Sequence, residues 1–187
     1  MKIATTLVNT ILVGSAAYAM YVIKPENPYA FAACALAFWH GLLGVVASLN
    51  PDSDRCNKIM IISMGMMEIV PLSLFNIEMY KTSANYSELQ PVFYFFIVPV
   101  IFDFIAKLTT GFDDSTEILK DLTLLANCGA LIFLGIDEDV YIYILMGVAM
   151  LFSKYGGLLM EYLVEGFGDD ATVFFYSIFF ILICCHF

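Results

Sequence analysis

Residues 28–49, PYAFAACALAFWHGLLGVVASL, form a run of 22 amino acids that contains no charged side chain. An α-helix rises about 1.5 Å per residue, so a helix of this length is long enough to cross the ~30 Å hydrocarbon core of a bilayer. A helix also satisfies all its own backbone hydrogen bonds, which lipid cannot do. The run therefore predicts a transmembrane helix.

Six further apolar runs of similar length lie on either side of this one. They cover residues 3–23, 59–80, 91–110, 118–136, 140–164 and 171–187. Short turns rich in charged residues, proline and glycine separate them, and such residues end a helix or stay out of lipid. The runs do not alternate between polar and apolar residues as barrel strands do. We predict an all-α, polytopic transmembrane bundle of about seven helices, in a single transmembrane domain over residues 1–187.

The composition agrees with this interpretation. Hydrophobic residues make up 61% of the chain and charged residues 14%, with a mean hydropathy of +0.85. A soluble domain has about half apolar and a quarter charged residues, and a small one has too little interior to bury such an excess. We expect an integral, multi-pass membrane protein whose surroundings are the lipid bilayer, in the plasma membrane or an endomembrane.

The charge balance excludes one class of partner. The chain has 18 acidic and 8 basic residues, for a net charge of −10. Nothing in it forms a lysine and arginine patch that would neutralise phosphates, so we expect no nucleic-acid partner.

The basic residues predict the orientation. With a cytoplasmic N-terminus, that side carries Lys2, Arg55, Lys58, Lys107 and Lys120, and the other side only Lys24 and Lys81. This asymmetry follows the rule that basic loops stay in the cytoplasm. Asn85 begins an Asn-Tyr-Ser glycosylation sequon, and it falls on the opposite side, where glycans are attached.

The first apolar run has an alternative interpretation. Lys2, an apolar core and the Ala17-Tyr18-Ala19 sequence also match a secretory signal peptide with its cleavage site. We expect the run to be the first helix of the bundle, and the sequence leaves open whether it is ever removed.

Six of the predicted helices carry a polar residue within the apolar run. These residues are Asn9, His40, Glu68, Asp103, Asn127 and Lys154. Counting from the cytoplasmic end places Asn9 and Asp103 at a depth of about 10 Å and the other four at about 15 Å. Polar groups in lipid are costly and need partners. We therefore predict one polar layer just cytoplasmic of the bilayer midplane.

The functional hypothesis is a ligand or ion site in this layer. Glu68 and Asp103 would be its acidic groups, Lys154 its basic group, and His40 a group that changes protonation near neutral pH. Proline residues lie close to both carboxylates in sequence, and interrupted helices often line the cavities of transporters. We expect a transporter or an ion- or proton-conducting bundle that takes a small polar solute or a cation.

The alternative is a static packing network. Lys154 then neutralises a carboxylate, Asp103 pairs with Lys107 on its own helix, and the asparagines join neighbouring helices. The protein would be a non-catalytic accessory or structural subunit that contacts other membrane proteins, or further copies of itself, through the aromatic fourth and seventh helices.

Other chemistry finds no support in the sequence. We found no catalytic, nucleotide-binding or metal-binding motif, and therefore predict no enzyme activity, no cofactor and no metal. Four of the five cysteines lie in apolar runs and are expected to pack as small hydrophobic residues.

Overall fold

The computed structural model describes residues 2–50, 53–109 and 117–187, and within these ranges every regular element is helical. The long helices are α1 (Lys2–Val22), α2 (Pro28–Leu49), α3 (Asp54–Thr82), α6 (Glu117–Asp137) and α9 (Gly168–His186). The shorter elements are the 3₁₀ turn η1 (Ser87–Leu89), α4 (Val92–Phe95), α5 (Val98–Thr109), α7 (Tyr141–Leu151), the π-helical turn η3 (Phe152–Gly156) and α8 (Gly157–Leu163).

These elements form seven helical passes, each long and apolar enough to cross a membrane, within the described part of the chain. Elements η1, α4 and most of α5 make up the fourth pass, and α7, η3 and α8 make up the sixth. The prediction of an all-α chain with about seven such helices is confirmed.

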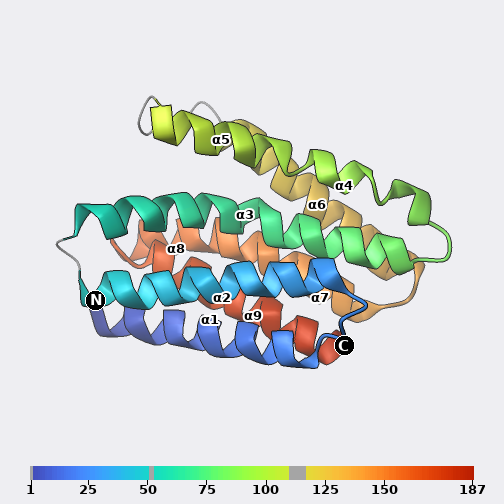
Figure 1. The fold of residues 1–187 in the computed structure, drawn as a ribbon, viewed down its shortest axis with the longest axis horizontal. Helices are drawn as coiled ribbons and strands as arrows, with labels where there is room; N and C mark the ends of the chain where they lie inside the picture. The colour runs from blue at the N-terminus through green and yellow to red at the C-terminus, as the bar shows by residue number, and fades with distance from the viewer. Residues whose placement is uncertain (1, 51–52, 110–116) are drawn as a thin grey trace.

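The passes run up and down along the long axis of the molecule (Figure 1). Helix α1 packs against α2 and α9, and α3 packs against α2 and α6. The fourth pass forms one edge of the bundle, where it contacts α3 and α6. Because successive passes are antiparallel, α1, α3, α6 and α9 all begin at one end, which we call the N-terminal end of the bundle.

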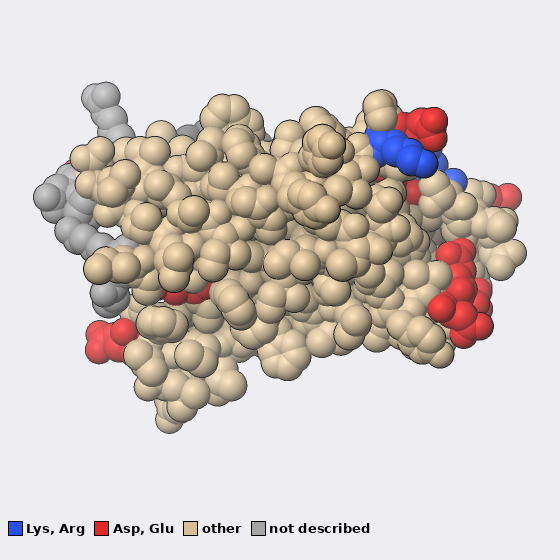
Figure 2. Space-filling model, turned by 90° about the horizontal axis from the view of Figure 1, so that it is seen from below, with Lys and Arg blue, Asp and Glu red and all other residues tan. Residues whose placement is uncertain are grey.

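Most of the molecular surface is apolar. On the face shown in Figure 2, charged side chains gather at the two ends of the long axis, and the surface between them carries almost none. Large hydrophobic side chains are open to the surroundings over many passes, among them Ile3, Tyr21, Leu158 and Tyr162. An apolar surface of this extent is unsuited to water and matches a hydrocarbon environment.

Two of the passes are interrupted. In the fourth, a turn at Phe96 and Ile97 separates α4 from α5, and Pro99 stands in the first turn of α5, where a proline is tolerated. In the sixth, the π-helical turn η3 inserts an extra residue per turn between α7 and α8. Helix α3 continues without a break through Pro71. The interruption of the sixth pass contains Lys154, which is described below.

Close contact between α1 and α2 depends on glycine. A Cβ atom built on Gly44 would overlap the side-chain amide of Asn9, and one on Gly41 would lie 2.8 Å from Val13 Cγ2. Gly14, in contrast, has nothing within 4 Å of such an atom. Small residues let helices approach closely where no hydrophobic force drives them together.

We predict that Gly44→Ala destabilises the protein by about 1–3 kcal/mol, because the added methyl group displaces Asn9 or forces α1 away from α2. Thermal unfolding of the purified protein in detergent measures the effect. The matched control is Gly14→Ala, which adds the same methyl group to open space and is expected to be neutral or to stabilise by up to about 1 kcal/mol. Equal effects of the two substitutions would contradict this account of the helix contact.

Candidate functional site

A buried lysine links three helices near the N-terminal end of the bundle. Lys120 of α6 is only 2% exposed. Its ammonium nitrogen lies 3.3 Å from Glu68 Oε2 on α3 and 3.7 Å from Asp103 Oδ1 on α5. It also pairs with Glu117, one turn earlier on its own helix. A buried ammonium needs such partners, because its isolated charge would be costly.

A second lysine shares two of these carboxylates. Lys154, in the π-helical turn η3, lies 2.9 Å from Glu68 Oε1 and 3.2 Å from Glu117 Oε2. Asp121 of α6 lies 3.4 Å from the same nitrogen. Glu68 and Glu117 therefore each bridge the two lysines. We call the six residues Glu68, Asp103, Glu117, Lys120, Asp121 and Lys154 the ion-pair cluster.

The cluster carries an excess of negative charge. Four carboxylates face two ammonium groups, so the formal charge is −2 when all six are ionised. Electrostatic attraction is much stronger in a poorly solvated site than in water. A partly buried cluster of this kind attracts positive charge.

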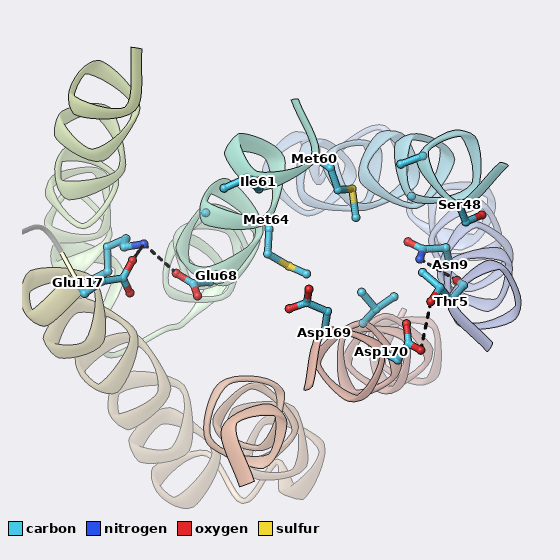
Figure 3. Close-up of a pocket in the computed structure, with 15 residues that line it drawn as sticks. Thr5, Asn9, Ser48, Met60, Ile61, Met64, Glu68, Glu117, Asp169 and Asp170 are labelled. Carbon is cyan, nitrogen blue, oxygen red and sulfur yellow. Dashed lines mark hydrogen bonds and ion pairs between the residues drawn. The ribbon is translucent and has the colours of Figure 1, made fainter. Parts of the chain in front are cut away.

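Two cavities adjoin the cluster. The first, of about 430 Å³, lies between α1, α2, α3, α6 and α9 (Figure 3). Its lining includes Thr5, Asn9, Gly44, Ser48, Met60, Ile61, Met64, Glu68, Glu117, Lys120, Asp169, Asp170 and Val173. The second, of about 410 Å³, includes Met64, Glu68, Lys154, Gly157, Glu161, Gly168, Asp169 and Thr172. Glu68 thus borders both cavities and contacts both lysines.

The N-terminus of α9 places two further carboxylates at the cavities. Glu161 accepts hydrogen bonds from the backbone N–H groups of Gly166 and Gly168, at 2.9 and 2.8 Å, and so holds the turn between α8 and α9. Asp169 and Asp170 follow directly in the first turn of α9. Acidic side chains are favourable there because the helix dipole is positive at its N-terminus.

The structure brings together three of the six polar residues predicted from the sequence. Glu68, Asp103 and Lys154 belong to the ion-pair cluster. Asp103 borders neither cavity, and one of its oxygens lies 3.7 Å from the ammonium nitrogen of Lys120. Asn9 lies on the wall of the first cavity, on α1. The side chain of Lys107, the alternative partner of Asp103, lies outside the described residues.

The other two predicted residues lie elsewhere. His40 Nδ1 is 2.8 Å from Ser63 Oγ, between α2 and α3. Asn127 Oδ1 accepts a hydrogen bond of 3.0 Å from Asn76, between α3 and α6. Each of these pairs joins two neighbouring helices, and neither His40 nor Asn127 lines the two cavities.

Several residues of the site were not singled out from the sequence. Lys120 was counted only as a basic residue of the cytoplasmic side, and Glu117, Asp121, Asp169 and Asp170 were not predicted as site residues. The spacing of Glu117, Lys120 and Asp121 could have predicted them, because residues three and four apart place their charged groups on one face of a helix.

The opposite end of the bundle holds a capping carboxylate. Glu78 is fully buried and accepts hydrogen bonds from the backbone N–H of Tyr29, at 2.8 Å, and from Lys81, at 2.9 Å. It therefore secures the start of α2. Asn85, the residue of the glycosylation sequon, is exposed at this same end, between α3 and η1.

Comparison with known proteins places the chain in a family. A family described as a domain of unknown function, DUF4791, matches residues 25–187. The chain belongs to the DUF4791 family. The match includes the whole ion-pair cluster, whereas α1, with Thr5 and Asn9, precedes it. Searches of curated proteins and of solved structures found no match.

We predict that Lys120→Met destabilises this DUF4791 protein by about 3–5 kcal/mol, because it leaves Glu68 and Asp103 without their shared cation. Lys24→Met, which removes an exposed lysine, is the control and is expected to change stability by less than about 0.5 kcal/mol. Unfolding in detergent measures both.

Adding Asp103→Asn to Lys120→Met should recover part of the loss, since it removes one of the negative charges that Lys120 offsets. Equal stability of the Lys120→Met and Lys24→Met variants would show that the cluster contributes nothing to the fold.

Proposed function

We propose that this DUF4791 protein is an integral membrane protein of the plasma membrane or an endomembrane, with a cytoplasmic N-terminus. Seven apolar passes and an apolar surface between two charged ends support insertion into a bilayer. The distribution of basic residues, five against two, supports the orientation. In this orientation the cavities and the ion-pair cluster lie at the cytoplasmic end.

The orientation has a direct test. In a Cys185→Ser background, which removes the exposed native thiol at the end opposite the cavities, a cysteine introduced at that end by Glu88→Cys should react with a membrane-impermeant maleimide added to intact cells or to right-side-out vesicles. Native Cys56, near the start of α3, should react only after the membrane is permeabilised. The reverse pattern would invert the proposed topology.

We further propose that the protein is a small transporter or conducting bundle for cations or protons, with the cluster and its cavities as the site. The observation that carries this proposal is the position of Glu68. Its carboxylate contacts both lysines and borders both cavities, within a cluster whose formal charge is −2. An ionisable group at membrane depth next to an open cavity typically marks an ion or substrate pathway.

The interrupted helices support the same function. Lys154 lies in the π-helical turn of the sixth pass, and π-helical turns are frequent at functional sites. Asp103 lies in the middle of α5, the helix that follows the break in the fourth pass. Transporters commonly bind their substrates where passes are discontinuous, because such joints allow one part of the bundle to move against another.

The alternative function is that of an accessory subunit in a larger membrane assembly. It draws support from Phe95 and Phe102, which are exposed on α4 and α5 at the edge of the bundle. This function requires no flux, and it predicts a stable complex with another membrane protein or with further copies of the chain.

We predict that purified protein in proteoliposomes supports proton or cation flux and that Glu68→Gln reduces this flux at least about tenfold, because the amide can neither pair with the lysines nor carry a proton. Flux is measured with a pH-sensitive dye and with ion-selective indicators inside the liposomes. Glu88→Gln, an equivalent change in an exposed loop, is the control and should leave the flux unchanged. Wild-type liposomes no more permeable than empty ones across a broad panel of ions would favour the accessory function.

A further inference from the structure

The sixth pass changes neighbours at its π-helical turn. Its first half, α7, packs against α6 so closely that a Cβ atom built on Gly147 would lie 2.7 Å from Ile132 Cγ1. Its second half, α8, packs against α9, where a Cβ atom on Gly157 would overlap Thr172 Oγ1. The turn η3 lies between the two halves, at the point where the pass leaves α6.

Helix α8 has open space on the sides that face α3 and α6. The second cavity, of about 410 Å³, lies between α3, which contributes Met64 to its lining, and α8, which contributes Leu158. An apolar groove of about 530 Å³ lies between α6, which contributes Leu125, and the segment from η3 to α8, which contributes Tyr155 and Leu159. A segment with few packed neighbours moves at a lower cost in free energy than one packed on all sides. Helix α8 can therefore move relative to α3 and α6 with less disruption than α7.

Lys154 connects this loosely packed segment to the ion-pair cluster. It lies in the middle of η3. Its ammonium nitrogen lies 2.9 Å from Glu68 Oε1 on α3, and 3.2 and 3.4 Å from Glu117 Oε2 and Asp121 Oδ1 on α6. Because the Lys154 side chain is only 14% exposed, water weakens these ion pairs less than it would at an open surface. Three carboxylates on two helices thus fix the direction in which η3 presents its lysine.

The geometry of η3 can change in a defined way. π-Helical turns are rare and occur mostly as single turns within α-helices, often at functional sites. Such a turn contains one residue more than an α-helical turn, and each residue of an α-helix turns the chain by about 100° and advances it by about 1.5 Å. A change of η3 to α-helical geometry would therefore rotate α8 relative to α7 and move it along its axis. The ion pairs of Lys154 oppose this change, because they hold η3 in its present orientation.

We propose that η3 is a conformational switch and that Lys154 is its latch. While Lys154 pairs with Glu68, Glu117 and Asp121, η3 stays π-helical and α8 forms one wall of the second cavity. When Lys154 leaves these carboxylates, η3 becomes α-helical, and the rotation of α8 changes the shape of that cavity. The inference concerns this motion and does not rest on transport. In a cation transporter, a cation at Glu68 would compete with Lys154 and so release the latch.

Double electron–electron resonance on the full-length protein in lipid nanodiscs measures this motion as a distance between two nitroxide labels. The native thiols that a labelling reagent reaches are first replaced by serine, at Cys56, Cys184 and Cys185. Cys34 and Cys128 are buried and stay in place.

Two pairs of labels separate a motion of α8 from a motion of the whole pass. The reporter pair is Ile59→Cys in α3 and Tyr162→Cys in α8. The control pair is Thr82→Cys in α3 and Tyr141→Cys in α7, which joins the same two passes on the other side of η3. All four side chains are exposed.

We expect Lys154→Met to shift the main distance of the reporter pair by about 2 Å or more, the scale of helix movements in switching proteins, and to leave the control pair unchanged. Lys154→Arg keeps the charge and should keep the wild-type distance of both pairs. Lys120→Met removes a lysine from the same cluster but not from the sixth pass, and it should leave the reporter distance unchanged. Lys154→Gln has hydrogen-bond donors but no charge, and it should shift the reporter pair in the same direction as Lys154→Met. It provides the test if the methionine variant does not fold.

Four results would overturn the inference. The first is an unchanged reporter distance in a folded Lys154→Met or Lys154→Gln variant. The second is an equal shift of the reporter and control pairs, which would show a general loosening of the bundle. The third and fourth are shifts in Lys154→Arg or in Lys120→Met as large as that in Lys154→Met. Flux plays no part in the measurement, so the switch can be confirmed in a protein that transports nothing and overturned in one that does.

Discussion

The carboxylate of Glu68 holds a position on which much of the bundle depends. One of its oxygens faces Lys154 at 2.9 Å and the other faces Lys120 at 3.3 Å. These contacts connect α3, α6 and the π-helical turn of the sixth pass, and Lys120 extends the connection to α5 through Asp103. Charges in an apolar bundle are stable only when paired in good geometry. The pairing therefore restricts how these four helices can rotate about their axes.

The two ends of the bundle differ in packing. At the end opposite the cavities, Phe75 lies with its ring centroid 5.8–6.4 Å from those of Tyr143, Phe179, His186 and Phe187. These edge-to-face contacts fill the space between α3, α7 and α9. At the N-terminal end, charged and small residues occupy the corresponding positions and leave two cavities. The two cavities therefore lie on the charged side of the bundle, away from the aromatic cluster around Phe75.

Counting along the predicted helices gave the height of each polar residue but not its direction. Glu68 and Lys154 were placed at the same depth, and the structure joins them directly. His40 and Asn127 were placed at that depth too, yet neither joins the ion-pair cluster. His40 pairs with Ser63 of α3, and Asn127 accepts a hydrogen bond from Asn76 of α3. A helix turns about 100° per residue, so a boundary error of one or two residues changes which neighbour a side chain meets. Which neighbour each side chain faces is decided by how the helices pack against one another.

The sequence by itself determined the helical class, the number of passes and the approximate level of the polar groups, because these depend only on local composition and on a fixed rise per residue. The tertiary structure decided which charges meet. Lys120 lies near a predicted turn and reads as an exposed basic residue, but α3 and α5 enclose it. Asp170, in the first turn of α9, is buried and accepts a hydrogen bond from Thr5 of α1. The partners of these two residues lie on helices distant in the sequence, and only the folded bundle brings them within the few ångströms over which charges pair and hydrogen bonds form.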